Sequence, residues 1–295
     1  MSWLRLIIVV CVCVLFWALL GAGFGALFRH PVGGFVCGLI LGSLYVVACS
    51  WAAPKFPGDV WGAKLLENVN APNLYEMLHT LSNRTGLALP TLYFTPQLEP
   101  NVFVSAGRDG ETAITVTSGL TRSLEKDEVQ AVLALMMARL ATGAIPNWTT
   151  AATLAGVPVS AGLSWQQRPG LAALGNLLLS LTAFPAALLN RLAWDEKVIT
   201  ASDYHAAHLA EQAGSLARAL AKIEAGLARE GAGNPATALL FAVPPLLPET
   251  PNAPLWRRGL EAFPFRTPDV AARAARFADV VPSYVAEPVE EFRIY

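Results

Sequence analysis

The residues best suited to catalysis lie close together late in the chain, between Asp195 and His208. Imidazole and carboxylate groups are common ligands of Zn²⁺, so His205, His208 and Glu196 could form a makeshift metal site. However, no two of the four histidines have the four-residue spacing that places two ligands on one face of a helix. A polar face on an alanine-rich helix is the competing interpretation of this cluster, and it is the one that we favour.

A metal site here would need a second helix to complete it, and the best candidate is residues 128–143, EVQAVLALMMARLATG. Ser123 is expected to cap this helix, because a serine side chain can accept hydrogen bonds from the first turn. Gly143 is expected to end it. Met136 and Met137 are expected to fill the core. Nothing in this segment completes a metal site.

The remaining polar regions predict a small α/β unit and further helices. Residues 73–84 place leucine and methionine side chains on one helical face. Three β-rich runs follow (TLYF, NVFVSAG and TAITVTSGL), and the turn RDGE joins the last two as a hairpin. Residues 193–229 predict an alanine-rich helical region broken at Gly214, and residues 268–278 predict a short helix.

Composition indicates a membrane protein. Of the 295 residues, 54% are hydrophobic and only 15% are charged, whereas soluble domains carry about 25% charged residues. The net charge of −1 offers no basic surface, so no nucleic acid is expected as a partner. The four cysteines lie in apolar N-terminal runs, without the spacing of a zinc ribbon or of a disulfide framework.

Four uncharged runs predict four transmembrane helices in two hairpins. Two lie within residues 1–55, on either side of the turn FRHP, and each has the roughly 20 residues that a span needs. A cleaved signal peptide is the alternative for the first run, but the second run follows it directly. Residues 144–167 and 169–190 form the second pair, with Arg168 at their turn. Glycines at four-residue spacing predict close helix packing by the second span: Gly34, Gly38 and Gly42.

The expected fold class is an α+β membrane protein with two transmembrane hairpins and a mainly helical domain that contains a small β-sheet. Positive charges favour the side of the membrane that holds the N-terminus, so the positive-inside rule places both parts of the domain in the cytoplasm. The expected segments are a hairpin, the first part of the domain, a second hairpin, the second part of the domain and a flexible tail: 1–55, 56–143, 144–191, 192–280 and 281–295.

This order of elements resembles the HtpX-type membrane zinc metalloproteases, which are relatives of the C-a-a-X prenyl protease and of the Oma-type proteases. The resemblance covers roughly residues 1–280 and is strongest from PNVFVSAG through VTSGLTRSLEKDEVQAVLA. A weaker similarity lies in RTPDVAARAARF, where Thr267 and Pro268 replace the family's His-Pro-Pro segment and Arg273 stands at the place of a later arginine. The domain is therefore expected to be metalloprotease-like.

The family's helix carries the motif H-E-x-x-H, and its third zinc ligand is a glutamate on a later helix, four residues before an aspartate. This spacing puts both histidines on one helix face, while the glutamate between them polarises the attacking water. On this sequence the four positions hold residues without that chemistry: Leu135, Met136, Arg139 and Ile199. Leucine and isoleucine cannot coordinate, methionine is a poor zinc ligand, and a protonated arginine repels a cation. The resemblance therefore implies a degenerate member.

The resemblance also implies a partner for Arg139. Its side chain would point into the space of the missing metal, and Asp203, which matches the family's aspartate, is the expected counter-ion. A buried charge without a partner costs several kcal/mol, so an Arg139–Asp203 ion pair would replace the zinc. Contact with solvent or lipid headgroups is the alternative.

A second implied feature is an edge strand that holds an extended substrate, matched here by Asn101, Val102, Phe103 and Val104. Main-chain hydrogen bonds supply the affinity of strand addition, so such binding can survive the loss of catalytic groups. An ordinary internal strand pair is the alternative.

These features predict a catalytically inactive, membrane-anchored metalloprotease homologue, a pseudoprotease, that binds a protein partner or client. No cofactor is expected. One alternative is an active zinc endopeptidase with displaced ligands at His205, His208 and Glu196; another is a structural subunit of a membrane complex. The family suggests membrane-protein quality control and the lipid bilayer of a bacterial inner membrane as the setting.

Overall fold

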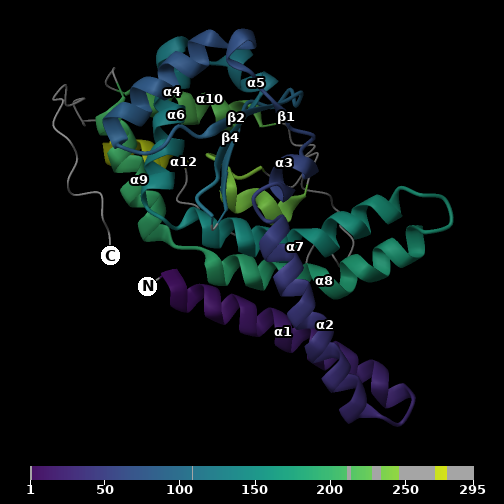
Figure 1. The fold of residues 1–295 in the computed structure, drawn as a ribbon. Helices are drawn as coiled ribbons and strands as arrows, with labels where there is room; N and C mark the ends of the chain where they lie inside the picture. The colour runs from purple at the N-terminus through teal and green to yellow at the C-terminus, as the bar shows by residue number, and fades with distance from the viewer. Residues whose placement is uncertain (1, 108, 211–213, 228–233, 246–269, 278–295) are drawn as a thin grey trace.

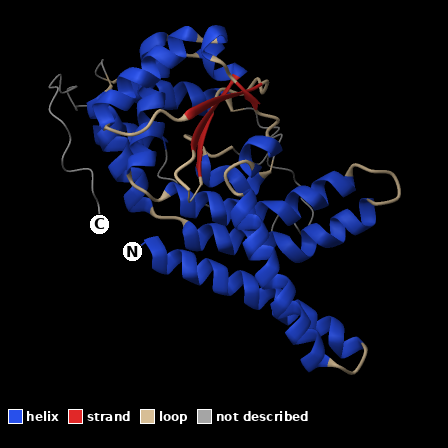
Figure 2. Ribbon diagram, in the orientation of Figure 1, coloured by secondary structure: helices blue, strands red, loops and turns tan. Residues whose placement is uncertain are grey.

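The computed structural model describes residues 2–107, 109–210, 214–227, 234–245 and 270–277. Most of these residues are helical, with one small sheet (Figure 2). The elements of the N-terminal half are α1 (Ser2–Leu27), α2 (Pro31–Ala52), α3 (Phe56–Val60), β1 (Lys64–Leu65), η1 (Asn68–Asn70), α4 (Pro72–Thr85), β2 (Thr91–Thr95), β3 (Val102–Ala106), β4 (Thr112–Thr117), α5 (Ser118–Ser123) and α6 (Lys126–Ala141). The later elements are α7 (Ile145–Gln166), α8 (Ala172–Ala193), α9 (Glu196–Leu209), α10 (Ser215–Gly226), η2 (Pro235–Leu240) and α12 (Val270–Phe277).

Helices α1 and α2 form the predicted N-terminal hairpin, which extends away from the domain (Figure 1). Both helices are long and apolar enough to cross a membrane. The glycine stripe packs them together: a Cβ atom at Gly34 would overlap the carbonyl oxygen of Gly21, and one at Gly38 would overlap that of Trp17. The stripe is therefore used inside the hairpin, while large apolar side chains such as Phe24 and Leu44 are exposed.

Helices α7 and α8 form a second hairpin (Figure 1). In this hairpin α8 is long and apolar enough to be a span by itself, whereas α7 is so only together with α6, from which it bends by 93°. The part of the chain that the structure describes therefore has three or four candidate spans. Pro158 in α7 lacks the N–H that would bond Leu154, and the Tyr45 hydroxyl on α2 donates to that carbonyl at 2.7 Å. The two hairpins thus touch, while four full spans stay a prediction.

The sheet has the strand order β1-β2-β4-β3, in which β2 and β4 are parallel and the other pairs are antiparallel. The predicted hairpin of NVFVSAG and TAITVTSGL is confirmed as β3 and β4. Strand β3 comes last in the order, yet all five of its residues are buried. Another part of the molecule must therefore cover its outer side.

Helix α6 runs through the centre of the domain, and every residue from Glu128 to Arg139 is buried. The prediction that Ser123 caps this helix was wrong, because Ser123 ends α5 and the cap is Glu125. Glu125 and Glu128 form a capping box that satisfies the backbone N–H groups of the first turn. Gly143 follows the helix in a left-handed conformation, with a φ of 66°. Glycine in this conformation commonly ends a helix, as the sequence predicts.

The other predicted helices are present. Helix α4 buries Met77, Leu78 and Leu81 and ends before Gly86 in a left-handed conformation. Gly214, also left-handed, separates α10 from the part of the chain that holds α9. The short C-terminal helix is α12, whereas Thr267, Pro268 and the expected tail at 281–295 lie outside the described residues. The expected division into domain parts stays a prediction.

Candidate functional site

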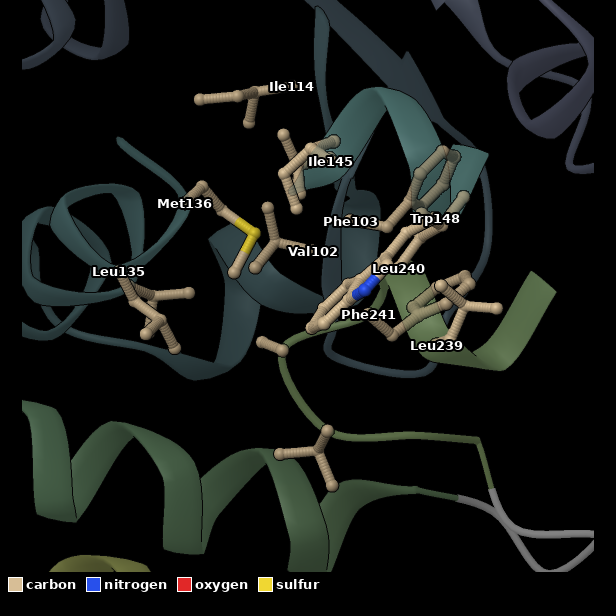
Figure 3. Packing of buried hydrophobic residues seen from close by; sticks show 14 of the residues in the cluster. Val102, Phe103, Ile114, Leu135, Met136, Ile145, Trp148, Leu239, Leu240 and Phe241 are labelled. Atoms are coloured by element: carbon tan, nitrogen blue, oxygen red, sulfur yellow. The ribbon is translucent and has the colours of Figure 1, made fainter. Parts of the chain in front are cut away.

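The four positions that match the protease motif are brought together in the core. Leu135, Met136 and Arg139 lie on α6, which packs against α9, and Ile199 lies on α9. Each is at most 1% exposed. Figure 3 shows Leu135 and Met136 within an apolar cluster that also contains Val102. The positions are thus filled by packed side chains, with Arg139 as the one charged group.

These side chains do not fit the zinc ion that the family resemblance implies. Leucine, isoleucine and arginine offer no lone pair to a metal, and thioether sulfur prefers softer ions. Within the described ranges, no group of three or more histidine, cysteine, aspartate or glutamate side chains could hold a metal ion. No hydrolytic step through zinc can be built on these residues.

The fallback ligands on α9 are not brought together either. Glu196 precedes His205 by nine positions on one helix, which corresponds to roughly 13 Å along its axis. Glu196 is largely exposed and lies 3.9 Å from the guanidinium of Arg276. The ring of His208 packs edge-on against Tyr204, with the ring centroids 4.5 Å apart. Burial and the neighbouring His208 lower the pKa of His205.

Arg139 is held by backbone oxygen atoms. Its Nη1 donates to the carbonyl of Phe241 at 2.6 Å, and its Nη2 donates to that of Ala242 at 3.4 Å. Its Nε has no hydrogen-bond partner in the described part of the chain. Burial lowers the pKa of Arg139 to about 9; the nearby Arg273 acts in the same direction, and Asp203 opposes them. The guanidinium is therefore a buried cation with two acceptors.

Asp203 has a different partner from the one expected. Arg273 on α12 donates two hydrogen bonds to its carboxylate, from Nε at 2.8 Å and from Nη2 at 2.7 Å. Within the described residues, Asp203 forms an ion pair with Arg273 and not with Arg139. The expected Arg139–Asp203 pair is therefore replaced by an Arg273–Asp203 pair. A planar guanidinium matches a carboxylate in this two-bond geometry, which explains why α12 supplies the counter-ion.

Both arginines converge on one short segment, Phe241–Val243, which we call the covering segment. Arg273 Nη1 donates to the carbonyl of Ala242 at 2.9 Å. Asn101 Nδ2 donates to the carbonyl of Val243 at 2.7 Å. With the bond from Arg139 to Phe241, all three carbonyl groups of the covering segment accept hydrogen bonds from buried side chains.

The covering segment lies along the outer side of β3. The backbone of Asn101 faces β4, because the amide of Thr117 donates to its carbonyl. Backbone groups alternate in direction along a strand. The N–H and C=O of the next residue, Val102, therefore point away from β4, toward the outer side of the sheet. The Ala242 amide donates to the Val102 carbonyl at 2.9 Å, and Phe103 and Phe241 form an isolated antiparallel bridge. The matched edge strand is therefore occupied by this chain itself.

Aromatic packing fixes the first residue of the covering segment. The ring of Phe241 lies 4.7 Å from that of Phe103 and 4.9 Å from that of Trp61, measured between centroids. Figure 3 shows Phe241 and Phe103 within the apolar cluster. The sequence interpretation missed this segment, although the β-rich run Phe-Ala-Val before Pro244 was a local signal for a short extended stretch.

Comparison with known proteins identifies close sequence relatives. A protein from Pelotomaculum thermopropionicum named Protease HtpX homolog is 33% identical over 193 residues, which cover 61% of this chain and 69% of the relative. Proteins of the same name from Thermococcus sibiricus and Gemmatimonas aurantiaca are 30% identical over 210 residues and 27% identical over 250 residues. The match to the Thermococcus sibiricus protein covers 66% of this chain and 72% of that relative. The match to the Gemmatimonas aurantiaca protein covers 82% of this chain and 88% of that relative.

No family model and no solved structure matches the chain. The sequence relatives carry the assignment, because they share the name and extend over most of both chains. Together with the apolar helical hairpins, they show that this chain is a membrane protein that belongs to the family of HtpX protease homologues.

Proposed function

We propose that this chain is a catalytically inactive HtpX homologue that binds a protein partner or client at the membrane. The observation that carries the proposal is the position of Arg139. It stands where the family resemblance places the second histidine, and it is committed to the carbonyl groups of the covering segment. A cation in that place opposes the binding of a second cation and supplies no general base.

Binding without cleavage needs a surface that is independent of the metal, and strand β3 offers one. Strand addition draws its affinity from main-chain hydrogen bonds, and the bond between Ala242 and Val102 is an example of such pairing within the chain. Partner binding, with membrane-protein quality control as one setting, is thus compatible with the loss of the catalytic residues.

The other functions receive less support. A zinc endopeptidase with displaced ligands would require Glu196 and His205 to meet at one ion, but both lie on α9, more than two turns apart. A structural subunit could use the glycine stripe of α2 as its packing surface, but that stripe already packs against α1.

The same proposal includes the arrangement in the membrane. Four spans in two hairpins, with both parts of the domain in the cytoplasm of a bacterium, agree with the positive residues near the domain ends of the helices, such as Arg5 and Arg191. Arg5 lies 3.2 Å from Asp195, so the start of α1 is tied to the start of α9.

The proposal is tested with the purified, detergent-solubilised protein and dye-labelled unfolded casein. Fluorescence anisotropy should show saturable binding, while dye release should stay at the level of a protein-free control with and without added ZnCl2. Thermolysin serves as the positive control for cleavage. Zinc-dependent hydrolysis that a chelator stops would overturn the proposal in favour of displaced ligands. Absence of both binding and cleavage would overturn it in favour of a structural subunit.

A further inference from the structure

We infer that the covering segment, Phe241–Val243, occupies the position of a bound polypeptide, and that a client binds by displacing it from β3. This inference rests on the proposed function and names the site, its internal occupant and the kind of peptide that it accepts. The geometry that carries it is the antiparallel bridge of Phe241 to Phe103 on the outer side of the last strand.

The covering segment pairs with only part of the strand. Its contact with β3 is an isolated bridge, whereas β3 extends over five residues from Val102 to Ala106. The residue that would face Val104 in this antiparallel pairing is Leu240, and it belongs to η2 instead of an extended strand. A client strand that stays extended there can form a longer ladder, so it can gain more main-chain hydrogen bonds than the covering segment makes.

Side chains, rather than a ladder, hold the covering segment in place. Arg139 donates to the carbonyl groups of Phe241 and Ala242, Arg273 donates to that of Ala242, and Asn101 donates to that of Val243. Such donors recognise any peptide backbone, because every residue carries a carbonyl group. They can therefore serve a client in the same positions once the covering segment leaves.

The neighbours of the covering segment define the sequence that fits. Trp61 and Phe103 flank the ring of Phe241, which favours an aromatic side chain at that position. Ala242 is 0% exposed, so the next position accepts only a small side chain. The site therefore fits an extended apolar segment in which an aromatic residue precedes a small one.

The test uses a dye-labelled, end-capped peptide with the sequence of residues 239–245, LLFAVPP, and the full-length protein in detergent. In the wild-type protein the tethered covering segment competes at high effective concentration. Phe241→Ala removes the ring that the tethered segment places against Trp61 and Phe103 and leaves the side-chain donors intact. It should tighten peptide binding by about tenfold or more, because a larger fraction of the molecules is open. Arg122→Met, at an exposed position on α5, should bind as the wild type does. A peptide with aspartate in place of phenylalanine should not bind.

Hydrogen exchange identifies where the peptide binds. On saturation, exchange of the Ala242 amide should accelerate, while the amides of Val102–Ala106 should stay protected. Phe241→Leu, which keeps an apolar side chain but loses the aromatic contacts with Trp61 and Phe103, replaces Phe241→Ala if that variant does not fold. Equal peptide affinity for all variants, no peptide binding to any of them, or unchanged exchange at Ala242 would each overturn the inference.

The failure of the inference and that of the proposed function are distinguishable. If casein binds without cleavage but exchange at Ala242 is unchanged, the inference fails and the proposed function stands. If casein is cleaved in a zinc-dependent reaction, the proposed function fails regardless of the peptide result.

Discussion

Replacing Arg273 by alanine is expected to lower the free energy of unfolding by about 3–5 kcal/mol, because removing one partner of a buried ion pair leaves the other charge uncompensated. The side chain of Arg273 is 0% exposed and that of Asp203 is 5% exposed, and two hydrogen bonds of 2.7 and 2.8 Å join them. The substitution also removes a donor from the carbonyl of Ala242. Chemical denaturation in detergent, followed by near-ultraviolet circular dichroism, measures the loss.

The same helix offers a matched control. Arg276 on α12 lies 3.9 Å from Glu196 with both side chains about half exposed, and Arg276→Ala should cost about 0–1 kcal/mol because solvent screens such pairs. The double variant Arg273→Met with Asp203→Leu should regain much of the loss, since a buried pair can often be replaced by apolar side chains. If Arg273→Ala costs no more than Arg276→Ala, the ion pair does not fasten α12 to α9.

Met136→Glu is expected to destabilise the protein by about 3–5 kcal/mol, as an unpaired buried charge does. The substitution restores the residue type that the family resemblance places at this position. Met136 is 0% exposed and belongs to the apolar cluster of Figure 3, so the carboxylate would have neither water nor a metal to compensate its charge. The loss is measured by the same denaturation experiment.

Met136→Leu is the control for this substitution, because it keeps an apolar side chain of similar volume and should cost less than about 1.5 kcal/mol. A Met136→Glu variant as stable as Met136→Leu would mean that the position opens to water, as an active site requires. That outcome would contradict the packed interior described above.

Local sequence signals predicted much of the fold. The uncharged runs predicted α1, α2 and α8, and the turn between two β-rich runs predicted the hairpin of β3 and β4. These features depend on residues close together in the chain. The cap of α6 was misassigned because serine is a preferred cap residue and glutamate is not, whereas α6 begins two residues later than expected, with the capping box of Glu125 and Glu128.

The site was less accessible to sequence reasoning because its contacts join distant parts of the chain. Arg139 and Phe241 are 102 positions apart, and Asn101 and Val243 are 142 positions apart. The family resemblance placed the motif positions together, but it could not show that Arg273 takes Asp203 or that the chain covers its own edge strand. Both arrangements depend on where α12 and the covering segment pack.

Zinc content tests the central claim, that side-chain contacts of Arg139 have replaced a metal between α6 and its neighbours. The purified protein is incubated with ZnCl2, dialysed and analysed by plasma mass spectrometry, with Arg139→Ala treated in parallel. The account predicts less than roughly a tenth of a zinc ion per chain in both proteins, because neither offers a set of deprotonated ligands. Close to one zinc ion per chain, lost on replacement of His205, His208 or Glu196 by alanine, would contradict it.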